Sequence, residues 1–363
     1  MTISLIVFLL LVGASLFILP LLPSFQELRR PRDAGAMDVH AHARVETRYF
    51  ALSFRRLLER HCYPLLSGVR DIAEQLQGEL PSGDPFVLVP GNRSYEFSEQ
   101  ERGRGLCKRI IVSAAQLDLP EKGKFEREIY AAGDLTVGPR ARVRAAYAEG
   151  DLRMRERAAS DRWLHSDKRV YVESGCALYG RTSAGESIRI EGSCGFERMR
   201  APEIILGERN YDEGWRASRQ PVEDCDLTKL PKFQSLSGGR ALFTGPLVIG
   251  PRRFIPHDLV VWGDLHLGEG CHVQGSIKVH GKAVLGAGVR VDGAIVAHED
   301  IEIGVGSRAL GPVLAERDLR IAARCQIGDS MKPATLRGRR VSLHMGSSIH
   351  GTVWATERGE VRA

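Results

Sequence analysis

The chain has 363 residues, of which 43% are hydrophobic and 7% aromatic, with 39 glycines and a formal net charge of +6. Basic and acidic residues are interspersed along the whole sequence, so the positive charge forms no block and we expect no nucleic-acid partner. The length allows one elongated domain or two compact ones, and the few aromatic residues and many glycines favour a narrow core.

The first segment, from Ile3 to Leu22, contains no charged residue. A helix of about 20 such residues spans the hydrocarbon layer of a membrane. No basic residue precedes the run and no Ala-x-Ala site follows it, which favours an uncleaved anchor over a signal peptide. Arginines 29, 30 and 32 follow the run, and the positive-inside rule then places the body in the cytoplasm. We therefore expect a single-pass anchor over 1–24, in the inner membrane.

A juxtamembrane joint with one helix is expected over 25–80. Between Val45 and Leu66, apolar residues recur at helical spacing at Phe50, Phe54, Leu57 and Leu58. Arginines lie on the other faces, so the helix is predicted to be amphipathic. Its apolar face could lie against anionic lipid beside the anchor or cover the open end of the structure that follows. The sequence leaves both alternatives open.

The most regular part of the chain is 259–330, where apolar residues recur every six positions. One series starts at Leu265 and a second starts two positions later, at Leu267. An α-helix needs a spacing of three to four residues and hairpins have irregular turns, so a fixed period of six favours neither. Each hexad is explained by a short strand with two inward side chains, followed by a corner.

Three such sides close a triangular coil of roughly 18 residues, a β-solenoid whose turns hydrogen-bond to one another. Side chains one turn apart then stack about 4.8 Å apart and form a core that no single turn could bury alone. The predicted columns are all apolar: Leu267, Leu285, Ile303 and Ile321; Val273, Val291, Ala309 and Ile327; and Ile277, Ile295 and Val313.

The six-residue step divides the body into two blocks. It is fainter and more polar over 81–206, is broken by an irregular excursion over 207–240, and returns over 241–356. The remaining tail is short and polar, so we predict that the last rung is bare and presents an unpaired strand edge. Ile349, Val353 and Trp354 are the candidate residues of an end-to-end contact between copies of the chain, giving a dimer or a filament.

Seven cysteines form no C-x-x-C pair. Cys176, Cys194, Cys271 and Cys325 fall in the inward series, so we expect buried thiols in a reducing compartment. A disulfide between Cys176 and Cys194, one turn apart, is the alternative for an oxidising compartment.

Several steps of this pattern resemble those of bactofilins, the polymer-forming cytoskeletal proteins of bacteria. The segments that carry the resemblance are GDLHLG from Gly263, GSIKV from Gly275 and VDGAIVA from Val291, and similar steps begin at Gly133 and Gly150. The resemblance is good over 259–330 and looser over 110–200. It implies a right-handed β-helix that assembles end to end without nucleotide and positions other proteins at the membrane. The anchor, the helical region and the excursion depart from that family.

The alternative is the left-handed β-helix of the hexapeptide acyltransferases, which also repeats every six residues. Its pairs begin with a small residue, whereas Leu265, Ile277 and Ile295 are bulky. No insertion over 259–330 walls a pocket for a histidine base. We therefore predict an all-β, membrane-anchored scaffold that self-associates and binds protein partners. We expect no enzymatic activity, no catalytic residue, no cofactor and no metal.

Overall fold

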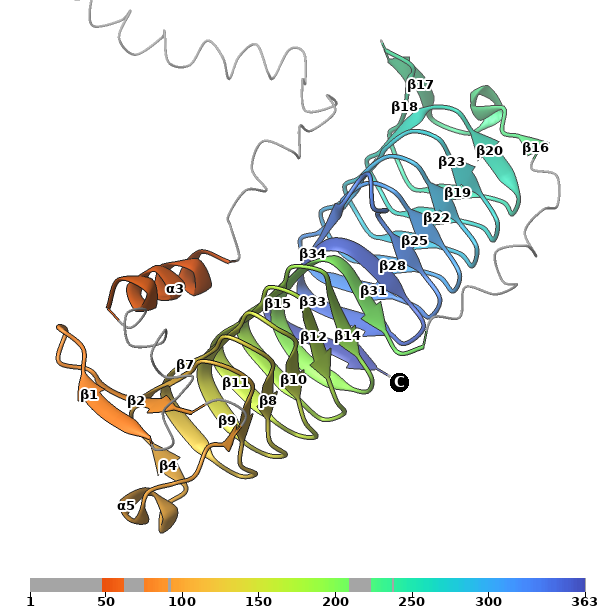
Figure 1. Cartoon of the computed structure of the whole chain (residues 1–363). Helices are drawn as coiled ribbons and strands as arrows, with labels where there is room; N and C mark the ends of the chain where they lie inside the picture. The colour runs from red at the N-terminus through yellow and green to blue at the C-terminus, as the bar shows by residue number, and fades with distance from the viewer. Residues whose placement is uncertain (1–47, 62–74, 91–92, 209–222, 237, 363) are drawn as a thin grey trace, which may run out of the picture. The chain divides into compact units, whose positions relative to one another are not determined.

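The computed structural model describes residues 48–61, 75–90, 93–208, 223–236 and 238–362 (Figure 1). The predicted anchor, from Ile3 to Leu22, lies outside these residues. Within the described ranges, no helix has the length and apolar character needed to cross a membrane. The chain divides into a unit over Met1–His42 and a unit over Ala43–Ala363, and all described elements belong to the second.

Strands stacked turn upon turn form two coils in this unit, which confirms the predicted β-solenoid (Figure 1). We call β2 to β15 the first coil and β18 to β34 the second coil. Three consecutive strands make one turn of the second coil, because β18 pairs with β21, β19 with β22, and β20 with β23. The turns pair in parallel, as expected when successive turns of one coil run in the same direction.

The first coil contains β2 (Pro85–Val89), β3 (Arg93–Ser94), β4 (Leu106–Cys107), β5 (Ile110–Ser113), β6 (Leu117–Leu119), β7 (Lys124–Ala131), β8 (Leu135–Val137), β9 (Arg142–Ala148), β10 (Leu152–Met154), β11 (Ala159–Ser166), β12 (Arg169–Val172), β13 (Ala177–Ala184), β14 (Ser187–Ile190) and β15 (Cys194–Leu206). Strands β7, β9, β11 and β13 each turn a corner, so that one strand lies on two sides of the coil. These long strands explain why the six-residue step is fainter here.

The second coil contains β18 (Arg240–Phe243), β19 (Leu247–Ile249), β20 (Arg253–Ile255), β21 (Asp258–Val261), β22 (Leu265–Leu267), β23 (His272–Val273), β24 (Ile277–Val279), β25 (Ala283–Leu285), β26 (Arg290–Val291), β27 (Ile295–Ala297), β28 (Ile301–Ile303), β29 (Arg308–Ala309), β30 (Val313–Ala315), β31 (Asp318–Ile321), β32 (Gln326–Ile327), β33 (Ala334–His344) and β34 (Ser348–Arg362). From β18 to β32, short strands separated by regular corners account for its clear period.

The registers of the paired strands place the residues of each predicted apolar column next to one another. Leu267 pairs with Leu285, Leu285 with Ile303, and Ile303 with Ile321. The columns from Val273 to Ile327 and from Ile277 to Val313 are confirmed in the same way. All these side chains are buried. Burying one Leu or Ile contributes about 1.5–3 kcal/mol, so each column stabilises the stack of turns it runs through.

The recurring Gly-Asp step has a structural reason at the corners. The Oδ1 atom of Asp264 accepts a hydrogen bond of 2.8 Å from the backbone N–H of Lys282, one turn further on. A Cβ atom on Gly281 would lie 2.1 Å from that same oxygen. The aspartate thus satisfies a corner N–H group. Gly281, the residue before Lys282, has to be a glycine, because a side chain there would collide with the neighbouring turn.

The predicted amphipathic helix is α3 (Tyr49–His61), and it lies on the side of the first coil. Ala51, Phe54 and Leu58 are buried against outward side chains of the coil. The rings of Phe54 and Trp163 lie 5.7 Å apart. The apolar face of the helix therefore packs on β9 and β11, and the alternative that it covers an open end is wrong.

Other elements cover the first turn of the first coil. Strand β1 (Leu76–Glu79) pairs antiparallel with β2, and the corner before β4 contains α5 (Glu99–Arg102). Under this corner Glu101 accepts hydrogen bonds of 2.8 Å from Arg109 and 3.0 Å from the hydroxyl of Tyr95. Burial opposes ionisation of Glu101, but hydrogen bonds from Ser98 and Arg109 outweigh it and hold its pKa below the usual value.

The expected excursion over 207–240 is ordered in its described part and covers the first turn of the second coil. Strand β16 (Glu223–Asp224) pairs with β20, and β17 (Phe233–Leu236) pairs antiparallel with β18. The short helix η3 (Leu227–Lys229) lies between them and buries Leu227. Sequence alone did not indicate this cover, because the six-residue step is broken over the whole excursion.

We predict that Leu267→Asp destabilises the second coil strongly. The carboxylate would enter a fully buried column without a partner, which costs roughly 4 kcal/mol or more. The melting temperature measured by circular dichroism should fall by roughly 8–16 °C. His266→Asp is the matched control, because His266, directly before Leu267, is exposed and points away from the core. Equal losses in both variants would contradict the assignment of the two faces.

Candidate functional site at the joint between the coils

The two coils meet at their last strands. Strand β34 of the second coil pairs antiparallel with β15 of the first, and the two strands lie next to each other in Figure 1. The pairing reaches all three sides, because its registers run from Cys194 opposite Val361 to Ile205 opposite Ser348. Strand β34 also pairs with β32 and β33 in its own coil. We call this contact the joint.

The joint contradicts the predicted bare last rung. Within the chain, Ile349 lies opposite Ile204, Val353 opposite Met199, and Trp354 opposite Arg198. Ile349 and Val353 are fully buried. The polar tail after residue 356 is the rest of β34, and its residues Arg358–Arg362 pair with Arg340–His344 of β33. The three candidate residues of a contact between copies therefore form a contact between the two halves of one chain.

Trp354 is held between two arginines at the joint. The guanidinium carbons of Arg198, from the first coil, and Arg337, from the second, each lie 4.8 Å from the centre of a ring of Trp354. Burial, followed by the charges of Arg181 and Arg200, lowers the pKa of Arg198. The indole thus receives a cation on each face, an arrangement worth about 0.5–2 kcal/mol for each pair.

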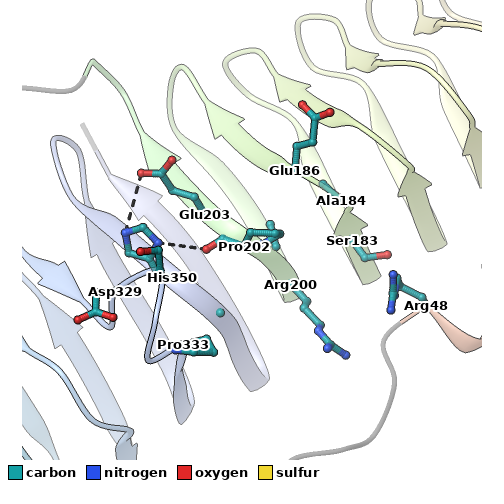
Figure 2. A pocket seen from close by; sticks show the side chains of 14 residues that line it. Arg48, Ser183, Ala184, Glu186, Arg200, Pro202, Glu203, Asp329, Pro333 and His350 are labelled. Carbon is teal, nitrogen blue, oxygen red and sulfur yellow. Dashed lines mark hydrogen bonds and ion pairs between the residues drawn. The ribbon is translucent and has the colours of Figure 1, made fainter.

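A cavity of about 540 Å³ opens beside the joint (Figure 2). Its lining comes from both coils and from Arg48, the residue before α3. The first coil contributes Ser183, Glu186, Arg200 and Glu203, and the second contributes Asp329 and His350. The site therefore exists only when the two coils are joined.

Two groups on the second-coil side of the cavity are fixed by hydrogen bonds. The Nδ1 atom of His350 lies 3.1 Å from the carbonyl oxygen of Pro202, and its Nε2 atom lies 4.0 Å from Glu203 (Figure 2). Asp329 accepts backbone hydrogen bonds of 2.7 Å from Lys332 and 2.9 Å from Met331. The bond from Lys332 is the main cause of the lowered pKa of Asp329, so this wall carries negative charge at neutral pH.

A row of outward side chains leads from beneath α3 to the cavity. Consecutive turns place Tyr130, Tyr147, His165, Ser183 and Arg200 next to one another on one side of the first coil. The rings of Tyr130 and Tyr147 stack 5.6 Å apart, and those of Tyr147 and His165 lie 5.2 Å apart. His165 is 1% exposed and Ser183 is 2% exposed. This side thus carries buried polar groups where the alternation of a strand would place surface residues.

Ser183, His165 and Asp167 are hydrogen-bonded in that order, and we call them the relay. The Oγ atom of Ser183 lies 2.8 Å from Nδ1 of His165, and Nε2 of His165 lies 3.2 Å from Oδ1 of Asp167. An ionised carboxylate only accepts, so Nε2 carries a hydrogen, and in the neutral ring Nδ1 accepts from the serine hydroxyl. The Oγ atom of Ser183 also lies 3.5 Å from the carbonyl oxygen of Leu164, a second acceptor for that hydroxyl. Of the three residues, Ser183 lines the cavity.

Asp167 is held from its other side by α3. Its Oδ2 atom accepts hydrogen bonds of 2.8 Å from the hydroxyl of Tyr147 and 3.3 Å from Arg55. Burial raises the pKa of Asp167, but the hydrogen bonds from His165 and Tyr147 and the charge of Arg55 outweigh it, so the net pKa is lowered. Asp167 is therefore ionised at neutral pH, and its interactions would weaken as the pH falls through its pKa.

The sequence interpretation missed the relay entirely. It considered a histidine base only over 259–330, where no insertion walls a pocket, and it expected no catalytic residue. The signal that could have found the relay is the spacing of Tyr147, His165 and Ser183, which lie one full turn apart in the outward series. Spacing alone does not show that α3 packs on β9 and β11, the strands that carry Tyr147 and His165.

The predicted burial of four cysteines is confirmed. Cys176, Cys194, Cys271 and Cys325 are buried free thiols. Burial raises the pKa of Cys194 to about 12 and that of Cys325 to about 11, so both stay protonated and unreactive at neutral pH.

We predict that Trp354→Ala loosens the joint. The loss of two arginine contacts and of packed ring surface should lower the free energy of unfolding by roughly 2–3 kcal/mol. Amide hydrogen exchange should accelerate in β15 and β34 but not in β8 or β10. Trp262→Ala is the control, since that side chain is 53% exposed on the second coil. Unchanged exchange in β15 would refute the role of Trp354.

Searches against family models, curated proteins and solved structures found no significant match to this chain. The resemblance to bactofilins therefore depends on the steps quoted from the sequence, and function has to be argued from the geometry of the coils and their joint.

Proposed function

We propose that this protein is a membrane-anchored scaffold of bactofilin type. In this proposal the apolar segment from Ile3 to Leu22 holds the chain in the inner membrane, and the two coils support partner proteins on the cytoplasmic side. The scaffold organises the cell envelope or cytoskeleton by the positions at which it presents those partners.

The joint is the observation that best supports this proposal. Strands β15 and β34 continue the sheets of one coil into the other, so hydrogen bonds run through both coils. A body built in this way resists bending, because each turn is tied to its neighbours on three sides. Rigidity over many turns suits a support for other proteins, and the outward positions of each turn supply a surface for them.

End-to-end assembly through Ile349, Val353 and Trp354 is not part of the proposal. The strand that carries them is paired on both edges inside the chain. One chain therefore already contains the contact that a second copy was expected to provide.

The predicted topology can be tested with a reporter fused after Ala363. A fluorescent protein that folds in the cytoplasm should be active there, and an alkaline phosphatase fusion should be inactive. Removal of residues 3–22 should release the chain from the membrane fraction. An active phosphatase fusion would contradict the proposed orientation.

Scaffolding can be tested with photo-crosslinking residues in intact cells. Outward positions 189, 248 and 266 should give discrete adducts with partner proteins, since Val248 is 69% exposed and Arg189 and His266 also face solvent. The buried position 267 is the control and should give none. Absence of adducts at all outward positions would contradict a scaffold that acts through these surfaces.

A further inference from the structure

We propose that Ser183 is a nucleophile activated by His165 and Asp167, and that the cavity at the joint hydrolyses small carboxylic esters with a polar alcohol part. This goes beyond the scaffold function and departs from the expectation, drawn from the sequence, of a chain without catalytic residues. The proposal depends on the relay, on its rigidity, and on the position of Ser183 at the cavity.

The relay has the order that serine activation requires. Asp167 fixes the ring hydrogen on Nε2, so the lone pair of Nδ1 faces the hydroxyl of Ser183 at 2.8 Å. A base within hydrogen-bond reach of a hydroxyl, itself oriented by a carboxylate, is the arrangement of nucleophilic serine sites. These roles are recognised by geometry and do not depend on a particular fold.

The relay is also held in place. The ring of His165 is buried beside Tyr147, and Asp167 accepts hydrogen bonds from Tyr147 and Arg55. Each group therefore has a neighbour that fixes its orientation, which is what a preorganised site needs.

The cavity supplies charged donors next to the nucleophile. Arg200 is the neighbour of Ser183 in the next turn, and Arg48 lines the same cavity (Figure 2). Guanidinium groups directed at a developing oxyanion would stabilise the tetrahedral intermediate. Glu186, Glu203 and Asp329 line the rest of the cavity, which favours an ester whose alcohol part is polar and carries no negative charge.

The reaction balances without a cofactor. The Oγ atom of Ser183 forms a bond to the ester carbonyl carbon while its proton passes to Nδ1 of His165. The bond to the alcohol oxygen then breaks, and that oxygen takes the proton from Nδ1. Water attacks the acyl-serine, gives its proton to Nδ1, and releases the carboxylic acid as Oγ recovers a proton.

The test uses the full chain in detergent with a fluorophosphonate probe, which forms a phosphorus–oxygen bond to an activated serine and releases fluoride. Mass spectrometry should map the label to Ser183. Ser183→Ala should abolish labelling, and it should lower hydrolysis of 4-nitrophenyl acetate about 100-fold or more. Asp167→Asn should lower the labelling rate about 100-fold, because the tautomer is no longer fixed.

Ser187→Ala is the matched control, since this half-buried serine four residues on lies outside the relay, and it should be labelled like the original chain. Ser183→Cys should lose fluorophosphonate labelling and react with iodoacetamide faster than Ser187→Cys, because His165 would promote formation of the thiolate at position 183. Circular dichroism should show that every variant is folded. A folded original chain without label at Ser183, or equal labelling of Ser183→Ala, would overturn the proposal.

Discussion

The antiparallel pairing of β15 with β34 is the contact on which the rest of this structure depends. The last turn of any solenoid ends in a row of backbone N–H and C=O groups that need partners. Here the last turn of each coil provides them for the other. Two coils that wind towards each other must run in opposite directions where they meet, so the joint is antiparallel although the turns within each coil are parallel.

The joint has the character of a twofold contact built into one chain. In a symmetric dimer, the same surface of each copy faces the other. Here the carboxyl-terminal ends of two related coils meet in that way, and the linking segment keeps them at a high effective concentration. The sequence led us to expect a contact between the ends of two copies. The structure has a contact between two ends within a single chain. The cavity follows from this, since its walls come from both coils.

The interior of the coils could be predicted from the sequence because the period reports which side chains point inward. The column through Leu267 and Ile303 needed no structure to find it. The period does not report which strand edge meets which, and so the part of β34 after residue 356 was predicted to be a polar tail. Gly359 illustrates the missing information: a Cβ atom there would lie 2.3 Å from the ring of Phe196 in the other coil. That glycine has a clear reason only once β15 is its neighbour.

The candidate site could be predicted even less. Alternation along a strand assigns His165 and Ser183 to the outside of the coil, and both side chains do point away from its core. Both are nevertheless buried, which alternation does not predict. Helix α3 packs on β9 and β11 beside His165, and it comes from more than a hundred residues earlier, so no local pattern encodes its docking position. Arg55 links that helix to Asp167, so the docking of α3 and the geometry of the relay depend on the same carboxylate.

The joint also fixes the order in which the molecule can be completed during synthesis. Strand β15 is made early, but its partner β34 contains the last described residues of the chain, about 140 residues later. At the usual speed of a ribosome this leaves the edge of β15 without that partner for roughly 7–30 s. During this time it is an open template for any other strand, including the β15 of a neighbouring nascent chain. A message truncated before β34 would leave that edge open permanently, so such fragments should aggregate even though the first coil is intact.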